Sequence, residues 1–165
     1  TAGESLDTTK STIGLAGWLM ASFAAGWIGS RYMPGAWYAS LTKPAWTPPN
    51  AVFGPAWSLL YVLMGIAAWL VWRKAGFGGA GAALGMFILQ LVLNALWSYL
   101  FFGLHRPDIA FFDIMVLLLV ILIVMVLFWQ EERRAGALML PYLLWVGFAS
   151  CLNFAIWRLN AGPPH

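Results

Sequence analysis

The sequence predicts an all-α integral membrane protein, a bundle of five transmembrane helices with a long Trp/Pro-rich loop between the first two helices that acts as a lid. Three observations predict this class. The 165 residues are 62% hydrophobic and only 9% charged, whereas a soluble domain carries roughly 25% charged residues. Five apolar runs reach the roughly 20 residues that a helix needs to cross a bilayer. Charged and turn residues fall between these runs, and the chain reads as one domain, 1–165.

The predicted spans follow one another closely, with one exception. They cover about 11–30, 52–72, 80–102, 109–129 and 136–157. Three connections are short, which favours antiparallel packing of sequential helices. Only the first connection, about 31–51, is long, and long loops in compact proteins are often functional. Lys and Arg divide almost evenly between the two sides, so the positive-inside rule does not set the orientation.

Composition also excludes several classes of function. The net charge of +3 is small and scattered, which gives no case for a nucleic-acid partner. A single cysteine, Cys151, rules out an intrachain disulfide. The two histidines, His105 and His165, lie in a loop and at the terminus. Because no cluster of His, Cys and carboxylates stands out, we expect no metal site and no required cofactor.

The one long connection contains prolines and tryptophans at high density. Proline lacks an N–H and restricts the preceding residue, so it interrupts a regular helix. The segment contains Pro44, Pro48 and Pro49, followed by Pro55. Trp46 and its neighbouring tryptophans supply flat apolar surface with a polar N–H. A stiff aromatic segment at the end of a bundle is expected to fold over a cavity as a lid.

The third span has two distinct faces. Gly81 and Gly85 form a GxxxG pair, which is a candidate homodimer face. The opposite stripe carries Gln90, Asn94 and Trp97. Polar amides at membrane depth need a partner or a wet cavity. These side chains either form hydrogen bonds between helices or line a binding site, and the sequence leaves both interpretations open.

The fourth span is almost entirely aliphatic, and its exception is Asp113, about one turn inside its start. An ionisable residue at that depth is expected to face the bundle interior. A structural role, holding this helix to a neighbour, is the preferred interpretation of Asp113, with ligand contact as the alternative.

Tryptophans near span ends, including Trp18, are explained by the membrane interface, where indole rings concentrate. Trp57, Trp97 and Trp145 lie several residues inside their spans and are not explained this way. Trp57 and Tyr61 are four residues apart on the second span, and Trp145 is followed by small side chains. This pattern favours a pocket wall with a hollow.

The chain closely resembles the TspO/MBR family of tryptophan-rich sensory proteins and mitochondrial translocator proteins, also called peripheral benzodiazepine receptors. The resemblance covers about residues 12–160. Its motifs are WY at 37–38, LTKPAWTPP at 41–49, GPAW at 54–57, QLVLNALW at 90–97, FFG at 101–103, PYLLW at 141–145 and LNFAIWR at 152–158. The first group of motifs, from WY at 37–38 to GPAW at 54–57, is already highly specific.

The resemblance implies a five-helix bundle, commonly a homodimer, whose pocket is closed by the first loop. It also implies ligands: porphyrins such as protoporphyrin IX, sterols in the mitochondrial branch, and synthetic benzodiazepine-type drugs. Together with the stripes above, positions carried over from the family give the candidate ligand-binding residues. They are Trp46, Pro48, Trp57, Tyr61, Asn94, Trp97, Trp145, Ala149 and Leu152.

Two departures from the family pattern bear on the ligand. The sterol-recognition pattern needs a Tyr shortly before Arg158, and this chain has Phe154 and Ala155 there, which lowers the expectation of tight cholesterol binding. A pocket tryptophan of mammalian members is replaced by Ile109, which lowers the expectation of high affinity for synthetic drugs.

The predicted function is that of a membrane receptor or sensor for porphyrins, with a role in tetrapyrrole or stress-linked regulation. Two alternatives stay open. The first is light- and oxygen-dependent porphyrin degradation, in which Trp57 and Trp145 would be the catalytic residues, as the resemblance implies. The second is transport of a tetrapyrrole or lipid. The expected partners are membrane lipids, the ligand and a second copy of the chain. The resemblance implies a bacterial membrane in a prokaryote and the mitochondrial outer membrane in a eukaryote.

Overall fold

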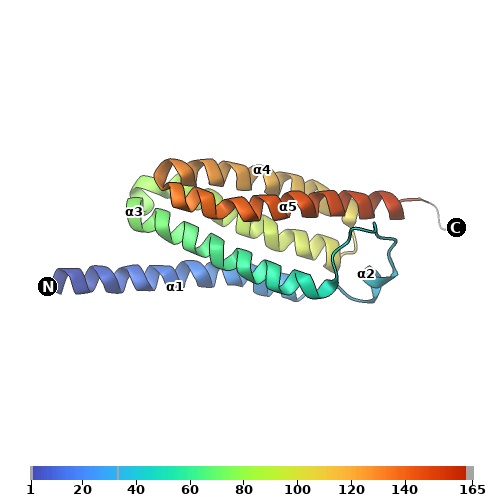
Figure 1. Ribbon diagram of the computed structural model, residues 1–165, viewed down its shortest axis with the longest axis horizontal. Helices are drawn as coiled ribbons and strands as arrows, with labels where there is room; N and C mark the ends of the chain where they lie inside the picture. The colour runs from blue at the N-terminus through green and yellow to red at the C-terminus, as the bar shows by residue number, and fades with distance from the viewer. Residues whose placement is uncertain (1, 33, 163–165) are drawn as a thin grey trace.

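The computed structural model is an elongated bundle of long helices, with the one extended loop gathered at one end (Figure 1). It describes residues 2–32 and 34–162, with side chains placed from residue 8 onward. The elements are α1 (Ala2–Ser30), α2 (Ala36–Ser40), α3 (Asn50–Ser98), the π-helix η1 (Tyr99–Gly103), α4 (Pro107–Glu131) and α5 (Arg133–Asn160).

Helix α3 contains two of the predicted spans, because it reverses direction in the middle (Figure 1). Gly76 has φ 64° and ψ −178°, and Ala80 has φ −125° and ψ 24°. The Gly76 conformation is essentially restricted to glycine, since a Cβ atom would clash with the backbone there. We call residues 50–75 the first arm of α3 and residues 81–98 the second arm.

Four stretches of the described chain are long and apolar enough to cross a membrane: Thr8–Ser30, Asn50–Gly103, Pro107–Glu131 and Arg133–Asn160. The second of these has 54 residues. It crosses twice, because its two arms run in opposite directions. The chain therefore makes five passes, as the sequence predicted, and is a multi-pass integral membrane protein.

The first helix extends beyond the predicted membrane span. The apolar run begins near residue 11, but α1 begins at Ala2. Hydropathy marks the part of a helix that lies in lipid, and the helix itself can continue into water. The interpretation of Trp18 as an interface residue was wrong. Trp18 lies in the middle of α1, is 9% exposed, and packs edge-on against Phe87 with ring centroids 5.7 Å apart.

The half of the bundle away from the long loop is closely packed. Met64, Phe87, Phe128 and Met139 are fully buried there and belong to one continuous core. Helix α1 approaches the first arm of α3 at Gly65, where an added Cβ would lie 2.8 Å from the Leu19 side chain. Glycine thus allows the two backbones to pack closely, as small residues do in membrane helices.

Asp113 faces the interior of the bundle, as expected for an ionisable residue at membrane depth. Its Oδ2 atom has no hydrogen-bond partner among the described residues. Whether Asp113 holds α4 to a neighbouring helix stays a prediction.

Candidate ligand-binding cavity

A cavity of about 500 Å³ lies in the half of the bundle next to the long loop. Four helical segments enclose it: the end of α1, the start of α3, the end of α3 with η1, and the second half of α5. No residue that lines it carries a charged side chain. Half of its lining residues are aromatic. The aromatic lining residues are Phe23, Trp27, Tyr32, Tyr38, Phe53, Trp57, Tyr61, Trp97, Phe101, Phe102 and Trp145.

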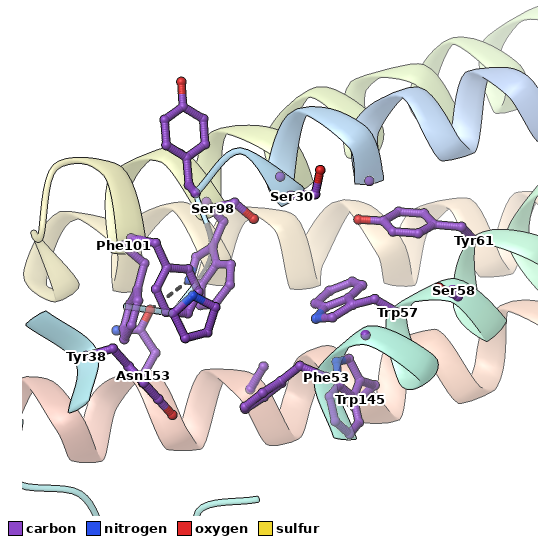
Figure 2. A pocket seen from close by; sticks show the side chains of 18 of the residues that line it. Ser30, Tyr38, Phe53, Trp57, Ser58, Tyr61, Ser98, Phe101, Trp145 and Asn153 are labelled. Atoms are coloured by element: carbon purple, nitrogen blue, oxygen red, sulfur yellow. Dashed lines mark hydrogen bonds between the residues drawn. The ribbon is translucent and has the colours of Figure 1, made fainter. Parts of the chain in front are cut away.

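One side of the cavity is a cluster of rings from α3 and α5 (Figure 2). Trp57 stacks on Tyr61 with ring centroids 5.7 Å apart, because residues four apart share a helix face. Trp57 also meets Trp145 edge-on at 6.3 Å, and Phe53 meets Trp145 at 6.2 Å. Ala149, one turn beyond Trp145, adds a small side chain to the lining. Two indole rings therefore border one open space.

The other side is built around the end of α3. Trp97 stacks on Phe101 at 5.2 Å, and its Nε1 donates a 2.8 Å hydrogen bond to Asn153 Oδ1 on α5. The π-helix follows directly, with the Leu104 N–H donating to the Tyr99 carbonyl oxygen at 2.8 Å. Such wide turns shift side chains out of α-helical register and are frequent at functional sites. Here η1 places Phe101 and Phe102 in the wall.

A buried chain of hydrogen bonds stands behind the cavity wall. The Tyr61 hydroxyl donates to Asn94 Oδ1 at 2.8 Å, and Asn94 Nδ2 donates to the Tyr142 hydroxyl at 2.8 Å. The Tyr142 hydroxyl in turn donates to Gln90 Oε1 at 2.7 Å. Gln90 and Asn94 thus join helices, which is the first of the two interpretations that the sequence left open. Asn94 lies behind Tyr61, outside the cavity lining.

The long loop lies at one end of the cavity and is tied to α5. Asn160 forms a reciprocal pair with the backbone of Thr42: the Thr42 N–H donates to Asn160 Oδ1 at 3.0 Å, and Asn160 Nδ2 donates to the Thr42 carbonyl at 2.9 Å. Trp37 stacks on His105 at 4.4 Å, which attaches the loop to the connection before α4. From α2, Tyr38 contributes its ring to the cavity lining (Figure 2).

Six predicted ligand-binding residues line the cavity, namely Trp57, Tyr61, Trp97, Trp145, Ala149 and Leu152. Trp46 and Pro48 belong to the loop but lie outside the lining. Trp46 is 49% exposed and packs against Phe148 at 5.6 Å. Ligand contact by Trp46, Pro48 and Asn94 stays a prediction.

Sequence reasoning missed the contribution of α1. Phe23, Gly26, Trp27 and Ser30 all line the cavity. Their spacing of three, four and seven residues places them on one helix face, and this periodicity was the signal that could have found them. Tyr38 in the loop was also missed, although it lies in the motif that the family resemblance rests on.

Two of the lining residues also carry buried polar atoms without partners. Trp145 Nε1 and the Tyr38 hydroxyl are buried and have no hydrogen-bond partner among the described residues. Burial raises the pKa of the Tyr38 phenol, so it stays a neutral hydrogen-bond donor. Buried donors without partners are rare in proteins, and both are at residues that face the cavity.

Gly81 and Gly85 lie on the outer face of the second arm of α3. Both are exposed, and a Cβ added at either would meet no atom within 4 Å. This stripe is therefore open to lipid or to another chain, and the dimer interface stays a prediction.

These features define an integral membrane helical bundle with an uncharged, aromatic-rich cavity next to its one long loop. The model of the TspO/MBR family matches residues 13–158, and the chain belongs to that family. It is 43% identical over 146 residues to the tryptophan-rich protein TspO of Archaeoglobus fulgidus, covering 87% of this chain and 94% of the relative. It is 41% identical over 146 residues to the tryptophan-rich sensory protein of Cereibacter sphaeroides, covering 88% and 90%. It is 36% identical over 151 residues to the human translocator protein, covering 88% and 89%.

Proposed function

We propose that this protein is a membrane receptor that binds a porphyrin, such as protoporphyrin IX, in the intramembrane cavity. Sterols and synthetic benzodiazepine-type compounds are further ligands of the same class of site, and the biological role is tetrapyrrole or stress-linked regulation. The observation that carries the proposal is the cavity of about 500 Å³ with indole rings on two sides. Ligand pockets commonly measure roughly 300–1,000 Å³ and are lined mainly by apolar and aromatic groups.

The chemistry of the lining suits a flat apolar ligand. Trp57, Trp97 and Trp145 offer ring faces and edges on which a macrocycle can stack. No His, Cys or Met is among the lining residues, so the lining lacks three of the side chains that commonly serve as axial ligands of an iron porphyrin. We therefore expect the metal-free macrocycle to bind.

The test is a titration of the purified protein with protoporphyrin IX in the dark, followed by quenching of tryptophan fluorescence. We expect saturable binding that Trp57→Ala and Trp145→Ala each weaken about tenfold or more, since each removes an aromatic wall worth more than 1 kcal/mol. Trp57→Phe, which keeps a ring, should retain much of the affinity. The matched control is Trp129→Ala, because Trp129 is half exposed and lies outside the cavity. Equal effects of all three alanine variants would contradict the proposal.

Light-dependent porphyrin degradation is the second candidate, and one observation favours it. The Trp57 and Trp145 rings are 6.3 Å apart and both line the cavity, so a bound porphyrin would lie against two indoles. A photoexcited porphyrin can accept an electron from such a ring, and oxygen can then react with the macrocycle. Illumination of the complex in air tests this. Loss of porphyrin absorbance that slows in Trp57→Phe and Trp145→Phe would support degradation, and unchanged rates in both variants would exclude a role for these residues.

We further propose that the protein forms a homodimer through the second arm of α3. Gly81 and Gly85 are both exposed, and the space beside each is open. Both observations support this face as the dimer interface. In lipid, close approach of small residues drives helix association through packing contacts.

A further inference from the structure

We propose that Arg31 and Lys43 hold the carboxylates of the porphyrin at one edge of the cavity, while its flat apolar body lies inside. This inference rests on the proposed function and names the residues that hold the charged edge of its ligand. It also gives the ligand a direction, with the charged edge at the loop end of the bundle.

The starting point is the absence of charge in the cavity. None of its lining residues carries a charged side chain, and a carboxylate without a counter-charge is costly to bury. A ligand that carries carboxylates therefore cannot place them against the aromatic wall. They must reach an edge of the cavity where cations are within range.

Two cations are positioned at such an edge, each on a ring that lines the cavity. The Arg31 guanidinium lies over the Trp27 ring, 4.5 Å from its centroid. Lys43 Nζ lies 4.8 Å from the centroid of the Tyr38 ring. Trp27 and Tyr38 both belong to the lining. Each aromatic side chain therefore presents one surface to the cavity while holding a positive charge beside it.

Both cations remain available for a ligand. The ion pairs among the described residues involve Lys74, Arg106 and Arg134, and neither Arg31 nor Lys43. Lys43 Nζ donates to the carbonyl oxygens of Tyr38 and Leu41, which leaves one of its three N–H groups free. Arg31 is exposed, and its planar guanidinium matches a carboxylate in a two-bond arrangement.

The charges at the loop end of the bundle point the same way. Among the described residues, the loop end of the bundle carries Arg31, Lys43, Arg106 and Arg158, against Asp108 in the first turn of α4 and the buried Asp113 further along that helix. Asp108 is already paired with Arg106 at 2.8 Å. Cations therefore outnumber carboxylates at the loop end, and an anionic edge finds complementary charge there.

The experiment compares protoporphyrin IX, which has two carboxylates, with its dimethyl ester, which has the same macrocycle and no charge. Binding is measured by tryptophan quenching in nanodiscs of zwitterionic lipid, which avoids competition from anionic headgroups. The variants are Arg31→Gln and Lys43→Gln, with Arg31→Lys and Lys43→Arg as charge-retaining versions. Arg73→Gln is the matched control, because Arg73 lies 4.4 Å over the Trp69 ring, which does not line the cavity.

We expect each neutralising variant to weaken binding of the free acid about two- to fivefold, the range for partly exposed charge pairs. The ester should bind equally to all variants, Arg73→Gln should change neither ligand, and the charge-retaining variants should restore affinity for the acid. Added salt should weaken binding of the acid only.

Two results would overturn the inference while leaving porphyrin binding intact. One is equal loss of acid and ester in Arg31→Gln and Lys43→Gln, which would show that these residues only support the aromatic wall. The other is undiminished binding of the acid in both variants. Lack of saturable binding by either porphyrin would instead overturn the proposed function, and this inference with it.

Discussion

Replacement of Tyr142 by Phe is expected to loosen the bundle behind the cavity wall. The Tyr142 hydroxyl accepts a hydrogen bond from Asn94 and donates one to Gln90, and all three side chains are nearly or fully buried. The change keeps the ring but leaves one donor and one acceptor without partners. Hydrogen bonds between membrane helices contribute about 0.6 kcal/mol on average and up to about 1.7 kcal/mol. Loss of these two hydrogen bonds should lower the free energy of unfolding by about 1–3 kcal/mol.

The assay is reversible unfolding in mixed micelles as the mole fraction of a denaturing detergent is raised. The matched control is Tyr99→Phe, which removes the same group from a side chain that is 39% exposed, where we expect a change of less than about 0.5 kcal/mol. A double-mutant cycle with Asn94→Ala isolates the Asn94–Tyr142 contact. A coupling energy near zero, or equal effects of the two Tyr variants, would refute the claim that this hydrogen-bond chain stabilises the wall.

Three further changes test particular contacts. Gly65→Ala should lower the free energy of unfolding by about 1–3 kcal/mol, because its Cβ would press on Leu19. The control is Gly17→Ala, whose Cβ would meet no atom within 4 Å. Equal unfolding midpoints for the two variants would contradict this packing. Gly81→Leu with Gly85→Leu should leave monomer stability unchanged and shift the oligomer toward monomer in sedimentation measurements, whereas an unchanged dimer would exclude this face. Asn160→Ala should speed porphyrin release several-fold in stopped-flow measurements by freeing the loop. Thr42→Ala should not, because the bonds use the Thr42 backbone.

Hydropathy was enough to predict the five passes, but it did not predict how α3 turns between two of them. A hydropathy pattern shows where the apolar runs end, and it placed a break at Gly78-Gly79. The reversal runs from Gly76 to Ala80 within a helix that is otherwise continuous. Which of several adjacent glycines adopts positive φ depends on the packing of both arms, and that information is not local to the sequence.

The candidate site was predictable where spacing alone defines a face. Trp57 and Tyr61 are four residues apart on one helix, and the structure stacks them against the cavity. The role of Asn94 depended on a partner, because its stripe also holds Trp97. The Tyr142 hydroxyl, 48 residues away in the chain, satisfies Asn94, and such a pairing appears only when the helices are assembled. Trp18 shows the same limit, since its burial depends on Phe87 across the bundle.

The position of the cavity bears on whether the protein carries its ligand across the membrane. All lining residues lie in the loop half of the bundle, whereas Met64, Phe87, Phe128 and Met139 fill the other half without exposed surface. A ligand crossing the membrane through the bundle would have to separate this core, at a cost comparable to opening several large cavities. Transporters avoid that cost with repeated halves and helices broken near the midplane. In the described chain, the glycine reversal of α3 and the π-helix lie at opposite ends of the second arm, away from its middle. The geometry therefore favours uptake and release of the ligand from one half of the bundle, as a receptor requires, over passage from one side of the membrane to the other.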